Sequence, residues 1–282
     1  MTDAVGRPLE HERAVDAGTP LIEADRLSIE YEKTRERTRL LALYDFTLTV
    51  PAGEFLVIVG PSGCGKTTFL SAVAGLVAPT SGSVHFEGAP VRGPGPDRAM
   101  VFQDYALMPW RTVEKNVRFG LEMAGRRGPR HNDAVQSYIE LVGLAGFEKS
   151  YPHELSGGMR QRVGLARALV VDPKVLLMDE PFAAVDAMTR EIMQGELARI
   201  IQETGKTVVF VTHSIDEALT LADRIAVITS RPGRLQEIIQ VDLPRPRYEK
   251  DVKASPRYQE LREHVWGLLQ QEVSQNLRSG VE

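Results

Sequence analysis

The sequence predicts an α/β fold with a mostly parallel core sheet, an N-terminal antiparallel β layer and an inserted helical subdomain. Continuous apolar runs that alternate with helical patterns indicate parallel strands covered on both faces. Between residues 26 and 54, short strand patterns follow one another with no helical pattern between them, which indicates the antiparallel layer. From about residue 104 to 172, strand patterns disappear and helical periodicity dominates, which indicates the inserted subdomain.

The strands are predicted from short runs rich in Val, Ile and Leu. They lie at residues 27–31, 46–50, 55–59, 83–86, 99–102, 175–178, 208–211 and 225–228. Three continuous apolar runs, at 55–59, 175–178 and 208–211, each precede a helical pattern. The expected helices are one from Lys66, one near 186–203, and others at 214–222, 133–142, 159–170 and around 258–272.

Composition divides the chain into three parts. Residues 1–20 form a polar tail that lacks the apolar segment of a signal peptide. Residues 21–241 form one large domain that contains the helical subdomain, and residues 242–282 form a proline-bearing linker and a C-terminal amphipathic helix. We expect this helix to pack on the domain, with a regulatory contact as the alternative.

Charge and cysteine content exclude several classes of protein. The 282 residues include 34 basic and 38 acidic side chains, with none of the basic stripes that indicate a nucleic-acid-binding surface. The longest uncharged run, 67–86, contains glycines and a proline that favour a helix, a turn and a strand over a membrane span. The single cysteine, Cys64, excludes an internal disulfide and is typical of a reducing compartment. We therefore expect a soluble chain without a nucleic-acid partner.

A glycine-rich loop follows the predicted strand 55–59 and fits the P-loop pattern in full. It consists of Gly60, Pro61, Ser62, Gly63, Cys64, Gly65, Lys66 and Thr67, with Thr68 next in the helix. Backbone N–H groups of such a loop surround phosphate oxygens, Lys66 reaches the β- and γ-phosphates, and the Thr67 hydroxyl binds Mg²⁺. The alternative, a glycine-rich turn with a surface lysine, does not account for the strand before the loop and the helix after it.

Two adjacent carboxylates, Asp179 and Glu180, follow the predicted strand 175–178. A P-loop requires a carboxylate at the end of a neighbouring strand to hold Mg²⁺, and Asp179 stands in that place. Glu180, directly after it, suits a general base for water. A helix-capping pair is the alternative for these two residues.

A second anion-seeking element lies far downstream, in the segment ELSGGMRQR at residues 154–162. Ser156, Gly157 and Gly158 precede a predicted helix, and the exposed N–H groups of a helix N-terminus attract anions. The P-loop already holds the phosphates of one nucleotide. This helix end therefore has no evident role inside a single copy of the chain.

The motifs occur in the order found in the nucleotide-binding subunits of ABC transporters, which the chain resembles over about residues 21–241. The resemblance implies the P-loop NTPase fold of an ABC ATPase. LSGGMRQR matches the signature motif of that family, with Met159 where many members have glutamine. Gln103 matches the glutamine of the Q-loop, and His213 matches the switch histidine.

Two further matches involve single residues. Asp186 ends an AVD segment that matches the D-loop, although Val185 replaces a commoner leucine. Tyr31 matches the aromatic residue that stacks on adenine, with Tyr44 as an alternative. A lone glutamine, histidine or tyrosine is weak evidence, and the resemblance depends on the joint order and spacing of the motifs.

The resemblance implies a role in ATP hydrolysis for each motif. Two copies pair head-to-tail and bury two ATP molecules, and each copy presents Ser156, Gly157 and Gly158 to the γ-phosphate held by the other. The resemblance also implies that Lys66 and the loop amides hold the phosphates and that Thr67, Asp179 and Gln103 bind Mg²⁺. It implies that Glu180 takes a proton from the attacking water, that His213 holds the γ-phosphate and that Asp186 makes contacts across the dimer.

Four longer stretches resemble the ATPase subunits of nitrate, sulfonate and taurine importers. They cover residues 101–117, 151–169, 179–191 and 222–238. The resemblance implies a separate transmembrane permease, a substrate-binding protein and a place at the cytoplasmic face of the inner membrane. The alternatives are a soluble ABC-type ATPase, which often carries two cassettes or long inserts, and a P-loop kinase, which would not need the signature motif or His213.

Two local features admit two interpretations each. The Cys64 thiol is reactive if the adjacent helix terminus lowers its pKa, and inert if the side chain points into the core. The stretch 104–110 is rich in apolar side chains. Either its Tyr105, Leu107 and Trp110 fill the core of the helical subdomain, or part of the stretch lines a groove for a short permease helix.

Overall fold

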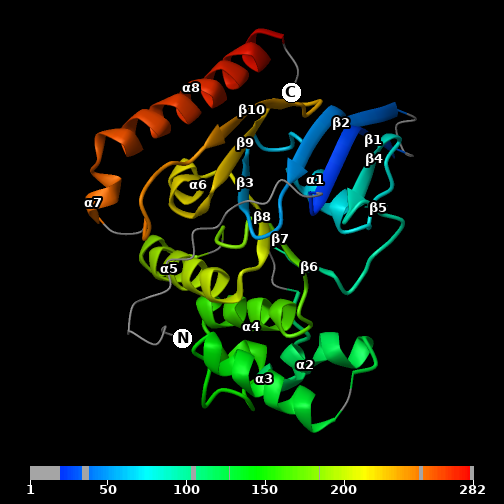
Figure 1. The fold of residues 1–282 in the computed structure, drawn as a ribbon, viewed down its shortest axis with the longest axis vertical. Helices are drawn as coiled ribbons and strands as arrows, with labels where there is room; N and C mark the ends of the chain where they lie inside the picture. The colour runs from blue at the N-terminus through cyan, green and yellow to red at the C-terminus, as the bar shows by residue number, and fades with distance from the viewer. Residues whose placement is uncertain are drawn as a thin grey trace, which may run out of the picture.

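The computed structural model describes residues 20–33, 38–102, 106–126, 128–183, 185–247 and 250–279. These residues form two sheets with covering helices, as drawn in Figure 1. The polar tail up to residue 19, Gln103, Tyr105 and Ala184 lie outside the described residues. Among the helices described, none has the length and apolar character that a membrane span requires.

The core sheet has the strand order β10-β9-β3-β8-β7-β6. Its strands are β3 (Phe55–Val59), β6 (Arg98–Val101), β7 (Val175–Asp179), β8 (Thr207–Thr212), β9 (Arg224–Ile228) and β10 (Leu235–Gln240). All neighbouring strands are parallel except β10, which is antiparallel to β9. Every residue of β3 and β8 is buried, as in strands covered on both faces. The predicted mostly parallel core sheet is confirmed.

The N-terminal layer is a second sheet, of order β2-β1-β4-β5, in which all pairs are antiparallel. Its strands are β1 (Ile22–Lys33), β2 (Thr38–Val50), β4 (Ser81–Phe86) and β5 (Ala89–Pro90). β1 and β2 are longer than predicted, because exposed polar residues on their outer face interrupt the apolar pattern. The sequence did not predict β5, which is very short, or β10, which carries partly exposed polar side chains at the sheet edge.

Helices cover the core sheet and extend to one end of the molecule (Figure 1). They are α1 (Lys66–Val73), α2 (Val113–Met123), α3 (Pro129–Leu141), the 3₁₀ helix η1 (Pro152–Glu154), α4 (Gly157–Leu169), α5 (Ala187–Thr204), α6 (Ile215–Leu221), α7 (Lys250–Lys253) and α8 (Pro256–Ser279). Helix α2 was not predicted. Helices α2, α3 and α4 follow β6 in the chain and lie together at the bottom of Figure 1. The limits 104–172 for a helical subdomain stay a prediction.

The two faces of the core sheet belong to two apolar cores. On β3, Phe55, Val57 and Val59 belong to one core, and Leu56 and Ile58 belong to the other. The first core also contains apolar residues of α4, α5 and α6, and the second contains those of α1 and the antiparallel sheet. The period-2 alternation of strand side chains thus buries both faces of β3.

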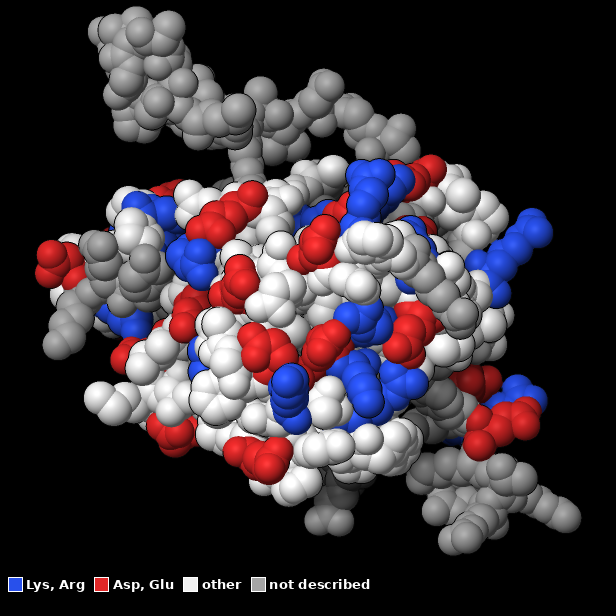
Figure 2. Space-filling view, turned by 90° about the horizontal axis from the view of Figure 1, so that it is seen from below, with Lys and Arg blue, Asp and Glu red and all other residues white. Residues whose placement is uncertain are grey.

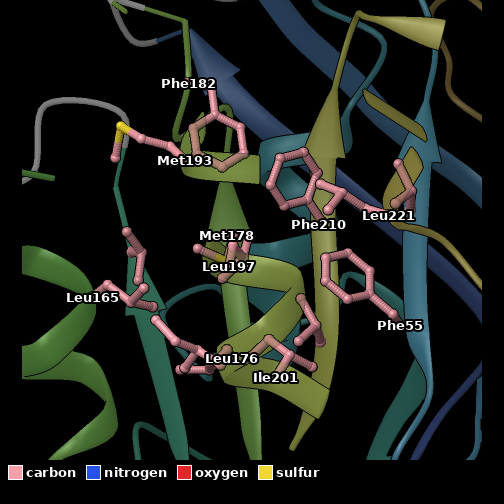
Figure 3. Close-up of a cluster of buried hydrophobic side chains, with 14 of the residues drawn as sticks. Phe55, Leu165, Leu176, Met178, Phe182, Met193, Leu197, Ile201, Phe210 and Leu221 are labelled. Carbon is pink, nitrogen blue, oxygen red and sulfur yellow. The ribbon is translucent and has the colours of Figure 1, made fainter. Parts of the chain in front are cut away.

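Phe210 of β8 packs against two other aromatic rings in the first core. Its ring centroid is 6.0 Å from that of Phe55 and 5.6 Å from that of Phe182. Figure 3 shows Leu165 of α4 and Leu197 of α5 in the same cluster of side chains. This core therefore joins α4, which begins with the second anion-seeking segment, to the sheet that carries the glycine-rich loop.

The register of the parallel strands determines which loops meet at the sheet edge. Val59 of β3 lies opposite Thr212 of β8, and Asp179 of β7 lies opposite Val211 of β8. Parallel strands have their carboxyl ends at one edge, where α/β proteins bind ligands. The loops that follow β3, β7 and β8 therefore begin side by side.

The C-terminal helix α8 packs against the domain along one face. Tyr258, Leu261 and Val265 are buried, and their spacing of three and four residues places them on one side of the helix. The Tyr258 hydroxyl donates a hydrogen bond to Asp216 Oδ1 of α6 at 3.1 Å. In Figure 1, α8 runs along the outside of the core sheet beside β9 and β10.

Candidate active site

The glycine-rich loop connects β3 to α1 in a conformation that requires glycine. Gly63 and Gly65 have φ values of 75° and 103°, in the left-handed region that favours glycine. A Cβ atom on Gly65 would lie 2.8 Å from the carbonyl oxygen of Ala42, which leaves no room for a side chain. Gly65 caps α1 without a side-chain hydrogen bond. The first N–H groups of α1 are thus available to bind an anion.

The Lys66 ammonium group lies within this loop. Lys66 is 5% exposed, and its Nζ donates hydrogen bonds to the carbonyl oxygens of Gly60 at 2.7 Å and Pro61 at 2.8 Å. Both acceptors are neutral, so the positive charge of the ammonium is not cancelled by them. The loop therefore combines backbone donors with a positioned cation, which is the arrangement that phosphate binding needs.

Thr67 and Asp179 meet where α1 begins and β7 ends. The Thr67 hydroxyl donates to Asp179 Oδ1 at 3.0 Å, and burial raises the pKa of Asp179. A hydroxyl and a carboxylate oxygen are ligands that suit Mg²⁺. No cluster of three or more His, Cys, Asp or Glu side chains that could hold a metal occurs among the described residues. An ion at this pair would also take ligands from phosphate oxygens and water, as Mg²⁺ commonly does.

Glu180 and His213 lie together at the same edge of the sheet. His213 Nδ1 and Glu180 Oε2 are 3.0 Å apart. Glu180 has a φ of 43°, which for a residue other than glycine costs on the order of 1–3 kcal/mol. Its N–H donates to Val211 O at 3.0 Å, which helps to hold this conformation. Such strain is common at catalytic positions.

A buried carboxylate, Glu217 of α6, supports the turn that carries His213. Glu217 Oε2 accepts a hydrogen bond from Thr212 Oγ1 at 2.5 Å, and Arg190 of α5 lies 3.7 Å from Glu217 Oε1. Arg190 also donates to Val185 O at 2.8 Å. Burial raises the pKa of Glu217. This network connects the turn before α5 to the His213 turn, and no motif or local pattern in the sequence predicts it.

An open pocket of about 280 Å³ lies against the glycine-rich loop. Its lining residues are Tyr31, Leu40, Ala42, Ser62, Gly63, Gly65, Lys66, Thr67, Thr68, Glu180 and Arg231. The Tyr31 hydroxyl lies 3.4 Å from Thr68 Oγ1, whereas the Tyr44 ring is covered by the Arg234 guanidinium at 4.3 Å. Tyr31 is therefore the better placed of the two aromatic candidates. Arg231 belongs to no motif in the sequence, and its place in this pocket was not predicted.

The second anion-seeking segment lies elsewhere in the molecule. Ser156 caps α4 by accepting a hydrogen bond from Met159 N at 3.3 Å. Asp186 caps α5 in the same way, accepting from Thr189 N at 3.0 Å, and its hydrogen bonds with Thr189 lower its pKa. None of the described residues that line the pocket comes from the 156–158 segment or from Asp186. Within one copy of the chain, the two anion-seeking elements are not brought together.

Comparison with known proteins gives consistent matches. The family model described as ABC transporter matches residues 43–183. The nitrate import ATP-binding protein NrtC of Synechococcus elongatus is 46% identical over 82% of this chain, which spans 36% of that relative. The taurine import ATP-binding protein TauB of Pseudomonas entomophila is 46% identical over 87% of this chain and 95% of the relative.

A solved structure is also similar along most of the chain. It is described as the dimeric structure of a post-hydrolysis state of the ATP-binding cassette MJ0796 bound to ADP and Pi. The TM-score is 0.69 with 30% sequence identity, covering 78% of this chain and 98% of that structure's chain.

The Cys64 side chain is buried beneath the glycine-rich loop. It is 1% exposed, and its Sγ lies 3.7 Å from Lys66 Nζ. Burial raises the pKa of the thiol, and the nearby ammonium opposes this effect only in part. The structure therefore favours the interpretation of Cys64 as an inert side chain in the core over that of a reactive thiol.

We expect a maleimide to label Cys64 much more slowly in the native protein than in the protein unfolded in guanidinium. Only the thiolate reacts, and a raised pKa leaves less thiolate near neutral pH than the unfolded chain has. The native labelling rate should increase as the pH rises toward the thiol pKa. Mass spectrometry of timed samples measures both rates, with Cys64→Ser as the unlabelled control. Equal rates in the native and unfolded protein would contradict the burial of this side chain.

Proposed function

Since the chain belongs to the ABC transporter family and is an ATP-hydrolysing importer subunit, we propose that it powers uptake of a small anion or organic solute of the nitrate, sulfonate and taurine type. The nitrate and taurine import relatives support this choice of solute class. The observation that carries the assignment of the site is the meeting of the glycine-rich loop, Asp179, Glu180 and His213 at one edge of the parallel sheet.

Each residue at this edge takes a distinct part in phosphoryl transfer to water. Lys66 and the loop N–H groups bind the phosphates and stabilise the charge that develops on them. Glu180 accepts a proton from the attacking water. His213, 3.0 Å from Glu180, binds the γ-phosphate and positions the carboxylate next to it. Tyr31 stacks on the adenine ring. Positioning and electrostatics supply most of the rate in reactions of this class.

Mg²⁺ is the cofactor that we assign to Thr67 and Asp179. When bound, the ion neutralises negative charge on the phosphates. The hydrogen bond between the Thr67 hydroxyl and Asp179 keeps both oxygen ligands at the loop. Gln103, which lies outside the described residues, is the third metal ligand in this proposal.

Two copies of the chain form a head-to-tail dimer in this proposal. Ser156, Gly157 and Gly158 at the start of α4 bind the γ-phosphate of the ATP held by the other copy, and Asp186 contributes contacts across the interface. The separation of this segment from the pocket within one copy supports the arrangement, as does the dimeric form of the similar cassette. Loss of the γ-phosphate removes a ligand that favours the closed state, so hydrolysis opens the dimer.

The remaining partners lie at the membrane. We assign the chain to the cytoplasmic face of the inner membrane, bound to a separate permease that works with a substrate-binding protein. Residues 21–241 form the ATPase domain, with the helical subdomain at 104–172, and residues 242–282 form the linker and C-terminal helix. Figure 2 shows acidic and basic side chains intermingled on one face, which does not favour a nucleic-acid partner there.

Coupling to transport distinguishes this function from that of a soluble ABC-type ATPase. Co-purification of the chain with a transmembrane permease separates the two functions. An ATPase that never associates with a permease would support the alternative.

Replacing Glu180 with Gln should preserve ATP binding and lower turnover by roughly 10²–10⁴-fold, the usual contribution of a general base. Size-exclusion chromatography with ATP and Mg²⁺ should then show a trapped dimer. The matched control is Glu203→Gln on the exposed end of α5, where the carboxylate pairs with Arg199, one turn away on the same helix. Hydrolysis at the wild-type rate in Glu180→Gln would remove Glu180 from its assigned role.

The segment after residue 105 divides into a packed part and an exposed part. Leu107 packs against the first apolar core, and Asn116 fixes the Met108 backbone by bonding both its N–H, at 2.9 Å, and its carbonyl oxygen, at 3.1 Å. Trp110, in contrast, is 74% exposed. Leu107 is partly buried in this packing, which does not favour its interpretation as a surface docking residue. Trp110 is the better candidate for contact with a permease helix.

Trp110→Glu should abolish assembly with the co-expressed permease while basal ATPase activity of the isolated chain is largely retained, because a buried charge at an interface is costly whereas an exposed one is not. Affinity co-purification measures assembly. The control is Trp266→Glu on α8, a second exposed tryptophan. If Trp110→Glu co-purifies with the permease in full yield, the docking surface lies elsewhere.

A further inference from the structure

The turn between β9 and β10 packs directly against the glycine-rich loop. Gly233 in this turn donates from its N–H to Ala42 O at 2.9 Å, and its carbonyl oxygen accepts from Tyr44 N at 3.0 Å. A Cβ atom on Gly233 would lie 2.0 Å from the carbonyl oxygen of Cys64, so only glycine permits this approach. The turn is therefore fixed both to β2 and to the loop that binds phosphate.

Arg231 extends from this turn to the phosphate loop. Its Nε donates a hydrogen bond to Gly63 O at 3.1 Å, and a Cβ atom on Gly63 would lie 2.7 Å from Arg231 Nη2. Arg231 lines the same pocket as Tyr31 and Lys66. A guanidinium has five N–H donors, and the bond to Gly63 uses the one on Nε. Its terminal nitrogens suit the oxygens of a phosphate.

The C-terminal helix holds the residue that precedes Arg231. Glu272 of α8 is 7% exposed, and its Oε2 accepts hydrogen bonds from Ser230 N and Ser230 Oγ, each at 2.9 Å. A buried carboxylate with two such bonds defines the backbone position of its partner. The contact therefore connects α8, through Ser230 and Arg231, to the phosphate loop.

We propose that Arg231 is a nucleotide-binding residue that contacts the phosphates of bound ATP or ADP, and that Glu272 of α8 is a positioning residue that sets the affinity of the site. This inference rests on the proposed function, since it takes the pocket to be the nucleotide site. It gives the C-terminal helix a role at that site: any change that moves Glu272 away from Ser230 weakens nucleotide binding. A role for Arg231 confined to fastening the turn is the competing explanation.

Calorimetric titration of the full chain with MgADP separates these explanations, because ADP binds without turnover. Arg231→Gln should raise the Kd for MgADP about tenfold or more, the usual effect of losing a hydrogen bond to a charged group. Arg231→Lys, which retains the charge and loses the planar fork, should give a smaller increase. In steady-state assays, Arg231→Gln should raise KM for ATP with kcat largely retained, as expected for binding that is equal in the ground and transition states.

Glu272→Gln should raise the Kd for MgADP by a smaller factor than Arg231→Gln, and the double variant should bind no more weakly than Arg231→Gln alone. Such non-additivity is expected when one residue acts through the other. The control on the same helix is His264→Gln, whose ring nitrogen lies 2.8 Å from Glu237 of β10, away from the turn. It should leave the Kd unchanged.

A Kd for MgADP in Arg231→Gln within twofold of the wild-type value would overturn the proposal, whatever the change in thermal stability. Full additivity of the two substitutions would overturn the positioning role of Glu272. The variant Lys66→Ala distinguishes failure of this inference from failure of the proposed function. If Lys66→Ala abolishes binding while Arg231→Gln does not weaken it, the site is correct and the inference about Arg231 is wrong; if Lys66→Ala binds normally, the assignment of the site fails.

Discussion

The parallel register of β3, β7 and β8 is the constraint on which the site depends. It places Val59 opposite Thr212 and Asp179 opposite Val211, so three loops leave the sheet at one edge. The 3.0 Å contacts of Thr67 with Asp179 and of Glu180 with His213 both follow from this alignment. Because strand side chains alternate with a period of two, a slip of one residue would direct Asp179 to the opposite face and separate both pairs.

Buried polar contacts hold this edge from two directions. On one side, Glu217 bonds Thr212 and faces Arg190, which in turn bonds the backbone of Val185 before α5. On the other side, the β9–β10 turn abuts the glycine-rich loop. Networks of this kind fix geometry because each unpaired member would be costly to bury. This edge of the core sheet is thus linked to the start of α5, directly after the D-loop match, and to the C-terminal region.

The sequence predicted those parts of the site that are local in the chain. The run 55–59 coincides with β3, and the helix expected from Lys66 is α1. Arg231, which bonds Gly63 at a separation of 168 positions, belongs to no motif and carried no such signal. The direction of the Cys64 side chain likewise follows from the fold of the loop rather than from its composition. The polar edge strand β10 was missed because its partly exposed residues do not form an apolar run.

The central claim is that the glycine-rich loop of one copy and the 156–158 segment of another build one ATPase site. Mixing two inactive variants tests it most directly. One is Lys66→Ala, and the other is Gly157→Asp, which places a negative charge beside the γ-phosphate at a position where a Cβ atom would lie 3.9 Å from Arg160 Nη2. Each mixed dimer retains one site built from two intact halves, so the mixture should hydrolyse ATP although neither variant does so alone. A mixture no more active than the sum of its two components would contradict the account.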